Sequence, residues 1–271
     1  MSNRNSQANK AAARERLRAE RERQAKKEKT RRQILVGVSV VGVLAIAGGV
    51  GWGVMQMNKP SQWEAAKDEK NVTAPKNTSG ENGTTVVIGK PTAKKTLEVY
   101  EDPRCPICAT LEQSIGETMQ KDIDAGKYKV KYIGATFLDD MIPGEGSKNA
   151  LSALGAALDV SPQTFLDYKS ALFSAKYHPE EADDKFKDDA YLIKIADSVD
   201  ALKGNKEFQK NVEDGTFDAW AMKMSETFDK SGVRGTPTLK MNGKPLTGSD
   251  GKNAPSTVEE FNTTINAALK G

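Results

Sequence analysis

The pattern of apolar and polar positions begins with one long apolar segment near the N-terminus. Residues 34–55 form a run of 22 residues without a charge. At a rise of about 1.5 Å per residue, a helix of this length spans the hydrocarbon core of a bilayer. A helix buried in a soluble domain is a poorer interpretation, because no face of the run is polar. The run therefore predicts a single transmembrane helix.

A cleaved signal peptide is the alternative interpretation of this run. The apolar region of a signal peptide has about 7–15 residues, which is shorter than residues 34–55. Ala45-Ile46-Ala47 nevertheless resembles a cleavage site. We expect a signal anchor that stays attached, with cleavage as the open alternative.

Farther along the chain, the spacing of apolar residues changes between that of strands and that of helices, which is typical of a mixed α/β domain. Residues 96–100 alternate between apolar and polar positions, which predicts a strand. A helical pattern runs from residue 109 to about residue 124 and ends at Gly126, and residues 128–136 predict the next strand. This order predicts a β–α–β unit.

The second half of the domain is mostly helical. Residues 147–230 have helical patterns, and residues 235–241 then predict a strand that ends at the turn signal Asn242-Gly243. The sequence Ser256-Thr257-Val258-Glu259 predicts a capping box that opens a C-terminal helix to Lys270. We therefore expect one α/β domain over residues 85–271.

Charge predicts the orientation of the transmembrane helix. Residues 1–33 contain 12 Lys and Arg against 4 Asp and Glu, whereas only Lys59 lies just after the apolar run. Basic flanks stay on the cytoplasmic side. Residues 1–33 are therefore predicted to be a basic cytoplasmic tail, either solvated or in contact with anionic lipid. The domain is predicted to lie outside the cytoplasm in a single-pass protein of the cell membrane.

The rest of the chain changes this picture in two respects. Its 28 Lys and Arg against 33 Asp and Glu give a mildly acidic domain, so the basic tail does not indicate a nucleic-acid partner. Residues 56–84 are rich in Asn, Lys, Ser, Thr, Gly and Pro. This composition predicts a flexible linker between membrane and domain.

The chain has two cysteines, Cys105 and Cys108, at the spacing C-x-x-C. Pro106 suits the first position of the following helix, which places Cys105 at its N-cap. Free N–H groups and the helix dipole lower the pKa of a thiol there, and the thiolate is the nucleophile of disulfide exchange. Cys108, one turn deeper, can resolve a mixed disulfide by attacking Cys105.

Other roles for the cysteine pair remain open. Half of a zinc site is one, although a structural site takes four ligands and the chain has one histidine. A structural bridge and two buried thiols are the others. The predicted location outside the cytoplasm favours a redox pair, because disulfides form and persist there.

The sequence around these cysteines resembles a known family. A strand that ends in Glu-Asp-Pro-Arg-Cys-Pro-Ile-Cys, followed much later by Gly-Val-Arg-Gly-Thr-Pro-Thr, resembles the DsbA-like branch of the thioredoxin superfamily. The resemblance covers about residues 85–271. It implies a thioredoxin-like fold with a helical insertion over about residues 145–231. It also implies that Pro237 is cis and that Thr236 and Pro237 hold the substrate backbone beside the cysteines.

The chain departs from this family at two positions. A buried acid commonly lies six residues before the first cysteine, where this chain has Val99. Proton transfer at Cys108 is therefore expected to use water or another group. Strongly oxidising members often have His between the cysteines, whereas Ile107 adds no charge, so we expect a less extreme oxidant. Two other features, His178 and the pair Asp139-Asp140, are expected in surface loops.

These features predict a thiol–disulfide oxidoreductase that forms or isomerises disulfides in exported proteins. Its redox group would be the Cys105–Cys108 disulfide, without a metal or other cofactor. The resemblance implies a quinone-linked thiol oxidase in the membrane as partner. The alternatives are a reductase of the same fold and a non-catalytic binding or chaperone module.

Overall fold

The computed structural model describes residues 61–270, which belong to one compact unit that begins at Ser61. The predicted tail, 1–33, and the predicted transmembrane helix, 34–55, lie outside the described residues. Within residues 61–270, no helix is both long and apolar enough to cross a membrane.

A five-stranded mixed sheet forms the centre of the domain, with the strand order β1-β3-β2-β4-β5. β2 and β3 are parallel, and the other neighbouring pairs are antiparallel. The strands are β1 (Val86–Ile88), β2 (Thr96–Glu101), β3 (Lys129–Gly134), β4 (Thr238–Met241) and β5 (Lys244–Pro245). The predicted β–α–β unit is confirmed as β2, α3 and β3. Asn242 and Gly243 have positive φ angles of 55° and 74°, as the predicted hairpin turn requires.

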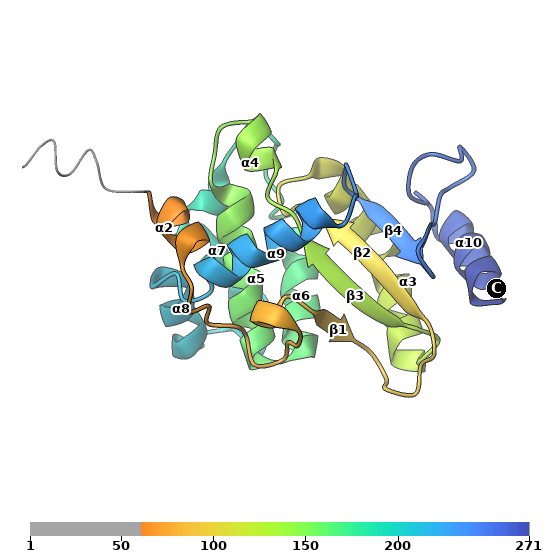
Figure 1. Ribbon diagram of the computed structural model, residues 1–271, viewed down its shortest axis with the longest axis horizontal. Helices are drawn as coiled ribbons and strands as arrows, with labels where there is room; N and C mark the ends of the chain where they lie inside the picture. The colour runs from red at the N-terminus through yellow and green to blue at the C-terminus, as the bar shows by residue number, and fades with distance from the viewer. Residues whose placement is uncertain (1–60, 271) are drawn as a thin grey trace, which may run out of the picture. The chain divides into compact units, whose positions relative to one another are not determined.

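Helices cover the sheet on both faces. In Figure 1, α3 lies behind the strands, α9 crosses in front of α5 and ends beside the tips of β2 and β3, and α10 flanks β4. The helices are α2 (Gln62–Asp68), α3 (Pro106–Ala125), α4 (Leu138–Met141), α5 (Gly146–Val160), α6 (Pro162–Leu172), α7 (Asp189–Ala196), α8 (Lys206–Glu213), α9 (Asp218–Lys230) and α10 (Val258–Lys270), with short 3₁₀ turns η1 (Glu81–Gly83) and η2 (Lys185–Lys187). Helices α4 to α9 form the helical insertion between β3 and β4. Helices α5 to α9 fall within the predicted bounds of about 145–231, and α4 lies before them.

Small residues let the insertion pack closely around α5. Twelve of the fifteen residues of α5 are buried, and they include Ala150, Ala153 and Ala157. At Gly155, an added Cβ would lie 2.8 Å from the ring of Trp220 in α9. A glycine is therefore required where these two helices approach each other.

The prediction of a flexible linker over residues 56–84 is wrong for residues 61–84, which form an N-terminal strap on the domain. Trp63 is buried, and Ser61 and Glu64 cap α2 reciprocally. The Trp220 indole donates a hydrogen bond of 2.9 Å to the carbonyl of Gly83. One apolar anchor and specific polar contacts order this segment, and average composition does not reveal either. Residues 56–60 lie outside the described part.

Candidate active site

The cysteines lie where β2 passes into α3. β2 ends at Glu101, and the N–H of Cys105 bonds to the carbonyl of Asp102 at 3.0 Å, which closes a turn. α3 begins at Pro106 with Cys105 as N-cap, and the sulfur of Cys105 accepts the N–H of Cys108 at 3.3 Å. Both cysteines are free thiols. The predicted placement of Cys105, Pro106 and Cys108 is therefore confirmed.

The surroundings of the two sulfurs move their pKa values in opposite directions. The hydrogen bond from the Cys108 thiol lowers the pKa of Cys105 to about 7, with help from the N–H groups of Cys108 and Ile107, although burial opposes the shift. Burial and the neighbouring sulfur of Cys105 raise the pKa of Cys108 well above its ordinary value. Cys105 is therefore the thiol of the pair that ionises first, and Cys108 keeps its proton to higher pH.

Sheet topology brings Thr236 and Pro237 to the thiols across 131 residues of sequence. β4 runs antiparallel to β2 with Thr238 opposite Tyr100, so the start of β4 meets the end of β2. The Thr236–Pro237 peptide bond is cis. The Cys105 thiol lies 3.5 Å from the carbonyl oxygen of Thr236. The Thr236 hydroxyl is buried and has no hydrogen-bond partner among residues 61–270.

A groove opens beside this centre. Its volume is about 310 Å³, and Ile107 at one side is 65% exposed. The groove runs between the first turns of α3, the cis-proline and the segment before α10. Its lining residues are Ile107, Thr110, Leu111, Ser114, Thr236, Pro237, Asn253, Ala254 and Ser256. The sequence predicted three of them as site residues, whereas the contribution from residues 253–256 follows only from the fold.

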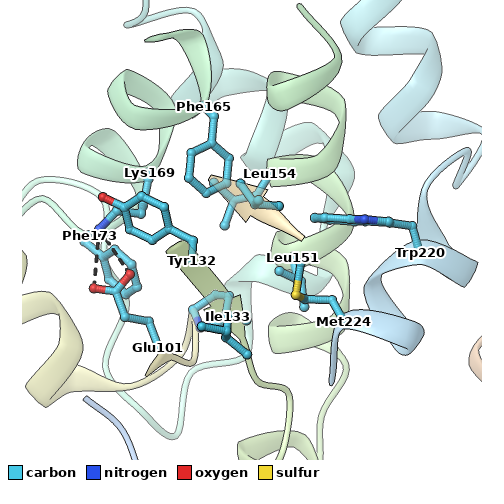
Figure 2. A pocket seen from close by; sticks show the side chains of 13 residues that line it. Glu101, Tyr132, Ile133, Leu151, Leu154, Phe165, Lys169, Phe173, Trp220 and Met224 are labelled. Carbon is cyan, nitrogen blue, oxygen red and sulfur yellow. Dashed lines mark hydrogen bonds and ion pairs between the residues drawn. The ribbon is translucent and has the colours of Figure 1, made fainter. Parts of the chain in front are cut away.

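A buried ion network lies one helical turn beyond Cys108. The ammonium of Lys169 in α6 lies 2.6 Å from Glu112 and 3.1 Å from Glu101. It also lies 5.2 Å from the ring centroids of Tyr132 and Phe173, and Figure 2 shows the paired Lys169 and Glu101 beside these rings. Burial raises the pKa of Glu101, and Lys169 opposes that shift. The negative charge of Glu101 contributes to the raised pKa of Cys108.

Sequence reasoning missed this network. Val99, at the position where the family commonly has a buried acid, is buried in the sheet, and Glu98 accepts a hydrogen bond from the hydroxyl of Tyr100. The available signal was Glu101, an acid at the end of the strand that leads to the cysteines. Lys169, 68 residues later, gave no sign that it would pair with that residue.

A small cavity adjoins the network. It has a volume of about 30 Å³, and its walls include Leu151, Trp220 and Met224 opposite Glu101 and Lys169 (Figure 2). About 10–15 Å³ holds one water molecule, and a buried water also needs polar partners. The end near Glu101 and Lys169 offers such partners, so this end suits a water beside the ion network.

Two of the residues expected in surface loops are in contact with the cysteine turn. Asp139 is buried and pairs with Arg104 at 2.7 Å, so its predicted exposure is wrong, whereas Asp140 is exposed as predicted. The His178 Nε2–H donates to the carbonyl of Pro103 at 3.1 Å. Both residues approach the turn from the helical insertion, which the local sequence around them does not reveal.

Known proteins share this sequence pattern. The family described as Thioredoxin matches residues 81–267. Disulfide bond formation protein D of Bacillus subtilis is 28% identical over 186 residues, which are 68% of this chain and 77% of that protein. Serine/threonine-protein kinase PknE of Mycobacterium tuberculosis is 28% identical over 158 residues, but these residues cover only 27% of the kinase.

Solved structures share the fold. BdbD from Bacillus subtilis, in its oxidised form, aligns with a TM-score of 0.56 and 25% identity over 73% of this chain and 99% of that chain. Oxidised DsbA from Mycobacterium tuberculosis aligns with a TM-score of 0.53 and 23% identity over 69% of this chain and 98% of that chain. The MdbA thiol-disulfide oxidoreductase from Actinomyces oris gives a TM-score of 0.57 at 18% identity, covering 78% of this chain and 98% of that chain.

Proposed function

This chain belongs to the thioredoxin family, and from that premise we propose that Cys105 and Cys108 are the redox pair with which it forms disulfides in exported proteins. It is a DsbA-like thiol–disulfide oxidoreductase. The observation that carries the proposal is the asymmetry of the two thiols. The pKa of Cys105 is lowered to about 7, while that of Cys108 is raised. The similarity to a protein named for disulfide bond formation supports the oxidising direction.

The proposed reaction begins with the Cys105–Cys108 disulfide. A substrate thiolate attacks the sulfur of Cys105, the disulfide breaks, and Cys108 leaves as a thiolate that takes up a proton because its pKa is high. A second substrate thiolate then attacks the substrate sulfur of the mixed disulfide. Cys105 leaves as a stable thiolate, and a low pKa favours this departure. Two electrons pass from two substrate thiols to the enzyme, which becomes the dithiol.

The groove beside Cys105 is the proposed binding site for the substrate chain. Thr236 presents its carbonyl next to the sulfur of Cys105, and Pro237 lies in the groove wall. An extended peptide that passes Thr236 and Pro237 would carry its cysteine to Cys105. Threonine, serine and asparagine side chains elsewhere in the wall suit hydrogen bonds to that peptide.

Turnover requires an electron acceptor and a location outside the cytoplasm. We assign residues 34–55 as the membrane anchor and residues 1–33 as the cytoplasmic tail, from length and charge. A quinone-linked thiol oxidase in the same membrane is the proposed acceptor. Anchoring both proteins in one bilayer raises their effective concentration.

Trapping of the mixed disulfide tests the assignment of roles. In the full-length Cys108→Ser variant, the Cys105 thiolate can attack the disulfide of an oxidised exported protein and release one of its sulfurs as a thiolate. Without Cys108 to displace the bound sulfur, the mixed disulfide at Cys105 should accumulate as a covalent complex. Cys105→Ser should abolish both the complex and the oxidation of a reduced model substrate. A Cys105→Ser variant that keeps its full effect on exported proteins would support the binding or chaperone module instead.

A further inference from the structure

The turn that delivers Cys105 to α3 is held by a buried carboxylate. Asp102 is fully buried, and one of its oxygens accepts the N–H of Arg104 at 3.0 Å and the hydroxyl of Ser147 at 2.6 Å. Its other oxygen accepts the N–H of Leu138 at 3.1 Å. One side chain therefore joins the turn to the start of α4 and to the first turn of α5, both in the helical insertion.

Arg104, the neighbour of Cys105, points away from the thiols into the same insertion. Its guanidinium is buried, pairs with Asp139, and donates to the carbonyls of Ile142 at 3.1 Å and Glu181 at 3.0 Å. Its Nε lies 3.5 Å from Asp184. The positive charge is taken up by these partners, so the role of Arg104 is to fix the turn and not to attract the thiolate.

His178 holds the remaining residue of the turn. Its Nε2–H donates to the carbonyl of Pro103 at 3.1 Å. Its ring stacks on Phe173 at a centroid distance of 5.8 Å and meets Phe186 edge-on at 5.7 Å. Phe173 in turn packs in the small apolar cluster that contains Cys105 and Cys108.

The buried charged groups around the turn are a poor means of stabilising the folded state. Burying charged groups carries a large desolvation penalty, and well-packed apolar side chains in place of a buried ion pair are often neutral or stabilising. The turn nevertheless places Asp102, Arg104 and Asp139 in the interior. What these groups provide is a fixed geometry for a turn that the sheet does not hold after Glu101.

We propose that the helical insertion clamps the redox turn, with Asp102, Arg104 and His178 as positioning residues that keep the Cys105 sulfur at the N-terminus of α3. The inference rests on the proposed function, in which substrate thiols attack the sulfur of Cys105 and Cys105 then leaves as a thiolate. The stabilising N–H of Cys108 lies 3.3 Å from that sulfur, a contact that weakens when the N-cap residue moves. Loosening the clamp should therefore destabilise the thiolate.

The full-length Asp102→Asn variant tests the clamp. The amide cannot accept at both ends, so it loses the N–H of Leu138 or the bonds to Arg104 and Ser147. We expect the acid dissociation constant of Cys105 to fall about tenfold, which is one pKa unit. The equilibrium constant for oxidation of glutathione should fall several-fold. Both are measured by thiolate absorbance titration and redox equilibration.

A second pair of variants keeps the test decisive if Asp102→Asn does not fold. His178→Phe keeps the aromatic stack and removes the donor to Pro103, so it should raise the pKa of Cys105. His178→Gln keeps a donor at that point and should remain closer to the wild type. Asp218→Asn is the control, because Asp218 is another buried carboxylate and accepts a hydrogen bond from Gln62 in the strap. It should lower stability and leave Cys105 unchanged.

The outcomes separate the two proposals. A wild-type Cys105 with an ordinary pKa and no exchange activity would contradict the proposed function itself. An active wild type whose Cys105 titration is unchanged in both Asp102→Asn and His178→Phe would overturn the clamp alone. A change in Asp218→Asn as large as that in Asp102→Asn would also overturn it, since the effect would then follow stability and not position.

Discussion

Cys105 and Cys108 lie within one helical turn, and their surroundings act on them in opposite ways. The sulfur of Cys105 receives hydrogen bonds at the N-terminus of α3. Cys108 is buried and lies near the negative charge of Glu101. Because a disulfide is more oxidising when its reduced form is stabilised, the lowered pKa of Cys105 favours an oxidant. The exposed Ile107 adds no charge to extend that effect.

The pKa of Cys105 predicts a pH dependence of stability. Its value is 9.0 in the absence of these contacts and about 7 in the folded protein. A depressed pKa adds stability as pH rises above the folded value, and that stability is lost as pH falls through about 7. Between pH 6 and pH 8 the reduced protein should gain about 1 kcal/mol of unfolding free energy. Urea unfolding at the two pH values checks this, with Cys105→Ser as the control that should show no such gain.

Glu101 predicts a separate effect on Cys108. Its charge raises the pKa of Cys108, so the neutral amide in Glu101→Gln should lower that pKa. Titration of Cys108 in a Cys105→Ala background measures it. Glu117→Gln is the matched control, because Glu117 lies on α3, the helix that contains Cys108, and 84% of its side chain is exposed. Equal shifts in the two variants would show that Glu101 has no special influence.

Single residues show where sequence reasoning succeeds. Cys105 and Pro106 could be placed because their motif is local and the helix start has fixed chemistry. The Glu101–Lys169–Glu112 network could not, because its partners are 57 and 68 residues apart and meet only through packing of α6 on β2 and α3. Asp139 was misjudged for the same reason, since its partner Arg104 lies 35 residues earlier.

At the level of elements, it was easier to predict whether a segment is a helix or a strand than to predict the residue at which it begins. The strand-like patterns of apolar residues predicted β2, β3 and β4 correctly, and the Asn242-Gly243 turn signal marked the end of β4. The sequence predicts the capping box of the last helix one residue too early. Glu259 and Glu260 are adjacent acids, and either could occupy the last position of the box. In the structure, Thr257 caps the N–H of Glu260 at 3.2 Å, and the Glu260 carboxylate accepts the N–H of Ser256 at 3.0 Å.

The N-terminal strap makes a prediction at this scale. Trp63→Ala empties a buried site between α2 and the insertion, and truncations of large buried aromatic residues cost about 3–5 kcal/mol. Unfolding free energy should fall by about 3 kcal/mol, while the pKa of Cys105 stays the same. Lys70→Ala, at an exposed position just after α2, is the control. If Trp63→Ala caused no loss of stability, the result would contradict the ordered strap and support the prediction of a flexible linker.

At the scale of the whole molecule, the fold explains how distant segments form one centre. The crossover from β2 to β3 sets the cysteines at the carboxyl end of the parallel pair, and the antiparallel β4 returns Thr236 and Pro237 to that end. The insertion between β3 and β4 supplies Lys169, His178 and Asp139 to the same region. The motifs therefore predicted the family and the positions of the two cysteines at the start of α3, whereas only the tertiary arrangement shows how the insertion supports them.

The reduction potential of the full-length protein, measured by equilibration with glutathione, tests the central claim most directly. A thiolate stabilised at the start of α3 without a further charge at Ile107 should give a potential between those of thioredoxin, about −270 mV, and DsbA, about −120 mV. Since 30 mV corresponds to about 1.4 kcal/mol for this two-electron couple, such a value lies a few kcal/mol from either limit. A potential below that of thioredoxin would contradict the account and would identify the protein as a reductase.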